Sequence, residues 1–489
     1  MPALAYRAVV LLLWGLAIHN SFACRGLFWD GAAFLANLID NRTFHDFYPA
    51  RAHVGWVTQA PVLIAIRAGV TDIHVLAIVQ SAALFMLPVG LYHLALARVR
   101  RDLVLSAVVL AILALVFLPV SFFIVGEYNA AYAAVTAAMA ILLTGGAHRR
   151  RDAAAVLALA ALCLRSYEAM AYLGPLMAAA VLWRRHGLPR DDVPARLMMA
   201  LAALAFAGSA LVAGGTIFIY WDHPHFTLVR AAILDFWQNL QFVVPVAGLA
   251  LVALVSLLWP SWLRGRLPAA LILLVAAVLA ATPWFRQLVG PESMVFPPSH
   301  YVARTAAGCL LWAMLLFMWV HIVWRERAPA PLRLLREGAV SRRLVLALAV
   351  LVLAAAIPDV ALTRLWTGYL AYVRGLVVDR TGDVRFADLP TRQWPRVLFS
   401  QDWTAPALGA LLRSDGRNAH LLGPQGAEPM PFDARCGTLP ELKGFYWRGL
   451  GSSRPVLTAA SSNSPDRCRA PAQPARRTRR GSCGCRAGR

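Results

Sequence analysis

Long apolar blocks alternate with short polar segments along most of the chain. Most blocks approach the roughly 20 apolar residues that a helix needs to cross a hydrocarbon core about 30 Å thick. A backbone inside lipid must satisfy its own hydrogen bonds, so the blocks are expected to be helices. The pattern predicts about eleven membrane-spanning helices. They are placed at residues 6–24, 73–97, 103–125, 130–146, 153–165, 169–183, 197–219, 241–259, 268–283, 305–324 and 344–358.

Residues 54–70 form a further apolar stretch that polar residues interrupt. Gln59, Pro61 and Arg67 lie inside it, so it is predicted to be an interfacial or re-entrant helix within a large first loop, residues 25–72.

The N-terminus resembles a signal peptide, because an apolar run follows Arg7 and a cleavage-like sequence ends at Ala23. We favour a retained first helix. His19 and Asn20 near its end suit a helix that packs in a bundle.

The composition fits this class of protein, with 59% hydrophobic and 15% charged residues, against about 45–50% and about 25% in ordinary soluble domains. The net charge of +22 comes largely from arginine in clusters between the apolar blocks, so we expect no nucleic-acid partner. Lys443 is the only lysine. This bias towards arginine, with abundant alanine, is typical of a GC-rich bacterial genome.

Basic residues follow every even-numbered span, which gives an orientation under the positive-inside rule. The N-terminus and these loops are therefore predicted to be cytoplasmic, and the C-terminus extracytoplasmic, in a bacterial inner membrane. The basic residues are Arg98, Arg100 and Arg101; Arg149, Arg150 and Arg151; Arg184, Arg185, Arg190 and Arg196; Arg264 and Arg266; and Arg325, Arg327, Arg333, Arg336, Arg342 and Arg343.

The transmembrane bundle is predicted to occupy residues 1–358, and residues 359–451 a small extracytoplasmic α/β segment. Apolar residues from Leu362 to Val377 recur at helical spacing, a short helix is expected to end at Leu412, and residues 419–422 read as a strand. Residues 452–489, rich in Ser, Pro and Arg, are expected to be disordered or to result from a frameshift.

Two carboxylates stand at the predicted external ends of early helices. Asp30, in Phe28-Trp29-Asp30-Gly31, could take a proton from a hydroxyl or hold a divalent cation, or simply cap a helix over residues 31–39. Glu127 is the only charged residue in the loop between the third and fourth spans. It could pair with Asp30 across one cavity, or favour a helix start.

Basic groups on the same predicted side are candidates for binding a phosphate. Arg304 and His300 precede the tenth span, and Arg165 lies between the fifth and sixth. Arginine grips phosphate through two parallel hydrogen bonds, although Arg304 could equally anchor at the interface and Arg165 could pair with Glu168. His223 and His225 flank a proline, a poor spacing for a shared metal.

This layout resembles the GT-C superfamily of membrane glycosyltransferases, which use polyprenyl-phosphate-linked sugars. The resemblance implies a catalytic aspartate just after the first helix, which Asp30 matches, and a second acidic position between helices three and four, which Glu127 matches. It also implies an interfacial helix in the first loop and a small C-terminal domain. The paired acids of several GT-C families are absent here, which leaves metal dependence and catalytic competence open.

The sequence therefore suggests a glycosyltransferase with a lipid-linked sugar donor. Asp30 and Glu127 would be catalytic and the only candidate ligands of a divalent cation, with Arg304, His300 and Arg165 on the donor phosphate. The chain lacks P-loop, Gly-x-Gly-x-x-Gly, Gly-x-Ser-x-Gly and HExxH motifs. The alternatives are a transporter or flippase of a lipid-linked intermediate, and a non-catalytic membrane protein.

Overall fold

The structure is a computed structural model that describes residues 1–45, 51–121, 127–145, 149–222, 240–289, 297–324, 329–378, 384–385, 404–412, 421–422, 442 and 444–447. The described residues belong to one compact unit, Met1–Arg448. Its helices are α1 (Ala3–Phe22), η1 (Arg25–Leu27), α2 (Asp30–Asn41), α3 (Ala52–Arg67), α4 (Ile73–Val99), α5 (Leu103–Ile112), η3 (Leu113–Phe117), η4 (Leu118–Val120), α6 (Glu127–Thr144), α7 (Arg149–Cys163), α8 (Met170–His186), α9 (Val193–Ile219), α11 (Leu240–Leu258), η6 (Pro260–Arg264), α12 (Leu267–Val289), α13 (Pro297–Val323), α14 (Ala330–Leu335), α15 (Gly338–Val378) and α16 (Ala405–Leu412).

Eight helical segments in the described part of the chain are long and apolar enough to cross a membrane. They correspond to eight of the predicted spans, and they give the chain the architecture of a multi-pass membrane protein. The other three predicted spans correspond to α6, α7 and α8, which have 18, 15 and 17 residues and are not among the eight. Almost every residue of α6 is buried, because α4, α7, α8 and α13 surround it.

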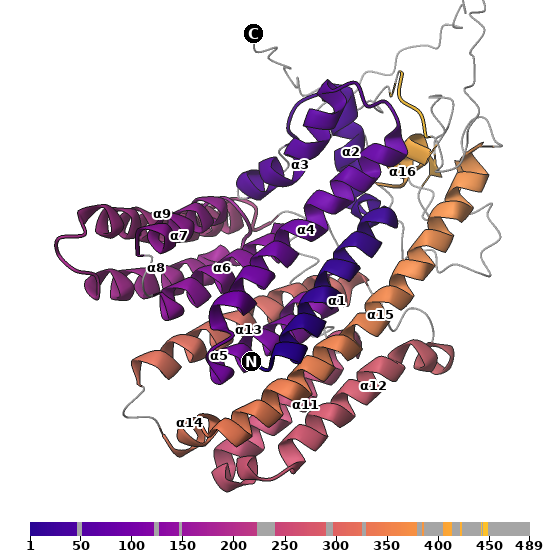
Figure 1. Ribbon diagram of the computed structural model, residues 1–489. Coiled ribbons are helices and arrows are strands. Elements are labelled where there is room, and N and C mark those ends of the chain that lie inside the picture. The colour runs from indigo at the N-terminus through magenta and orange to yellow at the C-terminus, as the bar shows by residue number, and fades with distance from the viewer. Residues whose placement is uncertain are drawn as a thin grey trace, which may run out of the picture. The chain divides into compact units, whose positions relative to one another are not determined.

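The long helices α1, α4 and α15 run side by side, with α1 between the other two (Figure 1). On the outer side of α15 lies α12, which also packs on α11. On the far side of α4, helices α6 to α9 pack on one another as a second group. The third span consists of α5, a single π-helical turn in η3 and a 3-10 turn in η4, and every residue of the last two is buried.

The predicted cytoplasmic loops gather at one end of this bundle. Arg98 pairs with Asp152, Arg150 pairs with Asp192, and Arg264 pairs with Glu337. Asp102 also pairs with His321 at this end. The remaining contacts here are hydrogen bonds to backbone carbonyls: Met1 to Arg100, Arg184 to Gly145, Arg336 to His321, and Arg343 to both Arg264 and Gly265. The basic segments thus share one end, as the charge pattern predicts.

At the opposite end lie α2, α3 and α16 (Figure 1), and α16 packs against both α2 and α15. A late segment of the chain joins them, because Tyr446 exchanges backbone hydrogen bonds with Thr71 and Ile73 at the start of α4. The ring of Trp447 lies 4.9 Å from that of His74. The first loop and the described C-terminal residues therefore lie at the same end.

The helix that contains the last predicted span does not end at residue 358, because α15 is a single helix of 41 residues that continues through Pro358 to Val378. The helical spacing noted from Leu362 to Val377 belongs to this same helix. The described residues beyond it include α16 and two short parallel strands, β1 (Val384–Arg385) and β2 (Leu421–Leu422). The predicted tail, residues 452–489, lies outside the described residues.

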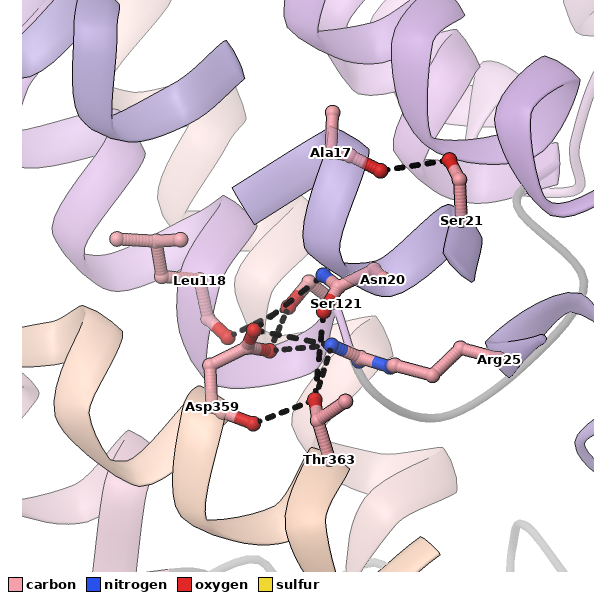
Figure 2. Close-up of polar contacts among 8 residues, drawn as sticks. All are labelled: Ala17, Asn20, Ser21, Arg25, Leu118, Ser121, Asp359 and Thr363. Atoms are coloured by element: carbon pink, nitrogen blue, oxygen red, sulfur yellow. Dashed lines mark hydrogen bonds and ion pairs between the residues drawn. The ribbon is translucent and has the colours of Figure 1, made fainter. Parts of the chain in front are cut away.

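Extending α15 places Asp359 deep in the bundle, at 2% exposure. Figure 2 shows its carboxylate between Arg25 of η1, Asn20 of α1 and Ser121, the residue that follows η4. Arg25 Nη1 donates to both carboxylate oxygens, at 3.0 and 2.9 Å, and Ser121 Oγ donates at 2.9 Å. Thr363 lies one turn further along α15 and receives a hydrogen bond of 3.2 Å from Arg25. Four chain segments are thus tied to one buried carboxylate.

Removing one member of this buried pair leaves the other charge without its partner in an apolar bundle. Arg25→Met and Asp359→Leu should each lower the free energy of unfolding by about 3–5 kcal/mol, and the double variant by less than either. Unfolding of the purified protein by SDS titration of detergent micelles measures this.

The matched control is the exposed pair Arg264 and Glu337, whose side chains are 65% and 41% accessible. Its single substitutions should change stability little. Additive effects of the two substitutions at Arg25 and Asp359 would contradict a coupled pair.

Candidate functional site

The turn that carries Asp30 has an unusual backbone. Cys24 and Trp29 both adopt positive φ angles, 51° and 46°, which cost non-glycine residues about 1–3 kcal/mol each unless the surroundings impose them. Here the surroundings are aromatic: Trp29 stacks on Phe28, and Phe28 meets Trp366 of α15 edge to face. The Trp366 indole also donates to the Ala23 carbonyl at 3.0 Å.

A second set of contacts clamps the two glycines that flank this turn. Gln80 of α4 donates to the carbonyls of Gly26 and Gly31, at 2.8 and 2.9 Å. Ser81 accepts a hydrogen bond of 2.8 Å from the Gly26 amide. The approach is so close that a Cβ at Gly31 would lie 1.8 Å from the Gly26 carbonyl oxygen. The backbone on both sides of Asp30 is therefore fixed.

Asp30 is the first residue of α2 and not its cap. Trp29 occupies the cap position, and it makes no side-chain capping bond. The capping role considered for Asp30 is therefore wrong in register, although a carboxylate in the first turn still suits the helix dipole.

Arg51, at the start of α3, connects two acidic residues from different parts of the chain. Its Nε and Nη2 atoms each lie 2.9 Å from Glu168 Oε1, and its Nη1 lies 3.4 Å from Glu127 Oε2. The Tyr167 ring lies 5.4 Å from the Arg51 guanidinium carbon. The interpretation that Arg165 pairs with Glu168 is wrong, because Glu168 pairs with Arg51.

Arg304, near the start of α13, lies within the same cluster. Its guanidinium carbon is 5.2 Å from the Tyr128 ring centre and 5.7 Å from that of Tyr167. Tyr132 completes a group of three rings, and its hydroxyl donates to the Arg304 carbonyl at 3.1 Å. Arg304 is 3% exposed, so it is not at an open interface.

Electrostatics link Asp30 to this cluster. The residue keeps some accessible surface, but desolvation of its carboxyl raises the pKa of Asp30 to about 6, against the lowering effects of Arg51 and Arg304. Desolvation likewise raises the pKa of Glu127 to about 7; Arg51 opposes the shift, and Asp30 and Glu168 add to it. The three carboxyls and two guanidiniums therefore form one interacting site.

The remaining candidate residues are more dispersed. The Arg165 guanidinium lies 5.8 Å from the Trp56 ring of α3, and its carbonyl accepts from the His53 amide. The side chain of His300 in α13 lies outside the described residues, as do His223 and His225. A narrow cleft between α2, α3 and α4 reaches Glu127 and is also lined by Phe34.

Three contributors to the site were not identified from the sequence. Arg51 is one of several arginines in the first loop, so nothing in the sequence distinguishes it as a residue of the site. Gln80 lies in an apolar span, where a buried amide normally has a specific partner, and that signal was available. Gln59, noted only as an interruption, holds His45 through two hydrogen bonds, of 2.8 and 2.9 Å, to its backbone.

Comparison with known proteins identifies no relative. No protein-family model, no curated protein and no solved structure matches the chain.

The close approach of Gly31 to the Gly26 carbonyl predicts that a side chain at position 31 would clash. Gly31→Ala must push the turn away from Gly26, so it should destabilise the protein by about 1–3 kcal/mol. Gly90→Ala in α4 is the control, since a Cβ there meets nothing within 4 Å and helical alanine is favoured by about 0.5–1 kcal/mol. SDS titration measures both variants. Equal stability of the two would contradict the clamp.

The raised pKa values predict carboxyls that stay protonated at higher pH than free side chains. Dicyclohexylcarbodiimide reacts with protonated carboxyls, so labelling should fall as pH rises, with midpoints at about pH 6 for Asp30 and about pH 7 for Glu127. Asp30→Asn removes a negative charge that raises the pKa of Glu127, so the Glu127 midpoint should move to lower pH. Peptide mass spectrometry measures both midpoints.

The control for this titration is Asp191→Asn. Asp191 is exposed and lies in the loop between α8 and α9, at the opposite end of the bundle. It should leave the Glu127 midpoint unchanged. An unchanged midpoint in Asp30→Asn would show that the two carboxyls do not interact.

Proposed function

We propose that this protein is a membrane glycosyltransferase of the GT-C type in a bacterial inner membrane. It would transfer a sugar from a polyprenyl-phosphate donor at the extracytoplasmic face. The observation that carries the proposal is the coupling of Asp30 and Glu127 with Arg304, since these residues come from three distant parts of the chain. The site also lies at the end of the bundle opposite the basic loops.

In the proposed reaction, the acceptor hydroxyl attacks the anomeric carbon while the bond from that carbon to the phosphate oxygen breaks. Asp30 accepts the hydroxyl proton. A pKa of about 6 suits a base that must be ionised near neutral pH and still bind a proton in the transition state. Glu127 is its acidic partner, and its charge depends on that of Asp30.

The leaving phosphate carries negative charge that needs an electrostatic partner. Arg304 is the best placed, because it lies among buried tyrosines, where a low local dielectric strengthens its attraction. His300 lies in the first turn of the same helix, α13, and Arg165 lies beside Trp56. Both remain candidate donors to the phosphate.

An apolar groove supports a lipid-linked donor. It lies between α1, α12 and α15 and is lined mainly by aliphatic side chains, with Trp284 and Arg364 as the exceptions. Leu365 is one of its lining residues and directly precedes Trp366, whose ring contacts Phe28 of the Asp30 turn. A polyprenyl chain in this groove would place its phosphate towards the turn. The proposed partners are thus the lipid-linked donor and membrane lipids, without nucleic acid.

One observation favours the alternative of a transporter or flippase. The candidate carboxylates were predicted at the external ends of helices. In contrast, the Arg25 and Asp359 pair is buried, and Asp359 lies in a candidate span. Buried ionisable residues in membrane helices are common along substrate pathways. The two functions differ in which charges they need: transfer requires Asp30, and transport requires no carboxylate that accepts a proton from a hydroxyl.

The proposal is tested with purified protein in liposomes that contain polyprenyl-phosphate sugars, by measuring sugar transferred to added acceptors. Asp30→Asn should lower the rate by about 10²–10⁴-fold, the range for loss of a general base. Glu127→Gln should also lower it. Asp191→Asn, at the other end of the bundle, should transfer at the normal rate. Full transfer by well-folded Asp30→Asn would exclude the assigned role. Donor movement across the bilayer without transfer would favour the alternative.

A further inference from the structure

The carboxylates of the site are organised by an arginine. Arg51 bridges Glu127 and Glu168, and the three side chains are only 10%, 7% and 12% exposed. They come from the residue that precedes α3, from the start of α6 and from the segment between α7 and α8. Arg51 also acts on Asp30. One guanidinium is therefore the cationic centre for all three acidic residues.

A divalent ion needs a different arrangement. Magnesium and calcium bind several oxygens that converge at about 2.0–2.6 Å from one point. Here the oxygens of Glu127 and Glu168 approach different nitrogens of one guanidinium, at 3.4 and 2.9 Å. Among the described residues, no group of three or more His, Cys, Asp or Glu is arranged to hold a metal. The donor set expected from Asp30 and Glu127 does not fit a divalent ion.

We propose that Arg51 is the built-in cation of this site and holds the Glu127 and Glu168 carboxylates in place of a divalent metal ion. A guanidinium keeps its charge at all physiological pH values, and its fixed fork of donors orients carboxylates. Arg51 is therefore a positioning residue, which pairs with the Glu127 and Glu168 carboxylates and whose charge also acts on Asp30, the proposed base. The inference uses the carboxylate site of the proposed function and does not depend on sugar transfer.

This role has a consequence for metal affinity. Without the Arg51 charge, Glu127 and Glu168 lose the cation that both contact, and Arg304 is the remaining cation that acts on Asp30 and Glu127. A hard cation should then enter where the guanidinium was. Terbium(III), a probe for oxygen-rich cation sites, emits when a nearby tyrosine is excited. The Tyr167 ring, 5.4 Å from the Arg51 guanidinium carbon, would serve as that donor.

The experiment titrates terbium into the purified full-length protein and follows tyrosine-sensitised emission. Wild type should show no saturable emission that depends on Glu127. Arg51→Gln should gain a saturable terbium site. Its affinity should exceed any terbium binding by wild type on the order of tenfold or more, because a repelling positive charge is gone. Arg51→Lys retains the charge and should behave as wild type. Adding Glu127→Gln to Arg51→Gln should abolish the gain.

The matched control is Arg67→Gln, which removes an exposed arginine at the other end of α3. It should bind terbium as wild type does. Saturable emission from wild type that Glu127→Gln abolishes would overturn the inference, and this arm needs no Arg51 variant to fold. A folded Arg51→Gln that gains nothing over Arg67→Gln would overturn it too. The measurement contains no donor or acceptor, so a failed transfer assay would leave its result intact.

Discussion

A charge buried among membrane helices must be paired, and the pairing of Asp359 with Arg25 is the constraint on which the rest of the structure depends. Asp359 belongs to α15, and Arg25 to the segment that leaves α1. Their hydrogen bonds also engage Asn20 and Ser121. Because an ion in an apolar medium is very costly without its partner, these segments can dock in only one register. That register determines where the chain turns towards Asp30.

The turn transmits this constraint to the site. Three sets of contacts hold residues 24–31. They are the ion pair of Arg25, the stacked rings of Phe28 and Trp29, and the hydrogen bonds from Gln80 to the Gly26 and Gly31 carbonyls. Two strained φ angles persist there because each neighbouring contact opposes their relaxation. Asp30 is therefore presented by a rigid element, which is what a catalytic or binding carboxyl requires if its pKa is to depend on fixed neighbours.

The sequence predicted the parts of the fold that depend on hydrophobicity and charge count. Eight spans, the common end of the basic loops and the helical spacing after Leu362 all follow from patterns within one segment. The last span was predicted to end at residue 358, because a proline and an aspartate normally end an apolar run, whereas α15 continues to Val378 and Asp359 within it pairs with the distant Arg25. Arg51 was missed for the same reason: its role comes from Glu127 and Glu168, which are remote in sequence.

The two ion-pair clusters differ in a way that bears on function. Arg25 and Asp359 match one cation to one anion, and Asn20, Ser121 and Thr363 add hydrogen bonds to the pair, so the charges of this cluster are balanced. The outer cluster sets Arg51 and Arg304 against three carboxyls, so it cannot be neutral unless a proton is bound. Burial raises the pKa of both Asp30 and Glu127, and the neighbouring carboxyls of Asp30 and Glu168 add to the increase for Glu127. A site that holds an exchangeable proton beside a buried arginine is suited to accept a proton from a hydroxyl and to stabilise a departing phosphate.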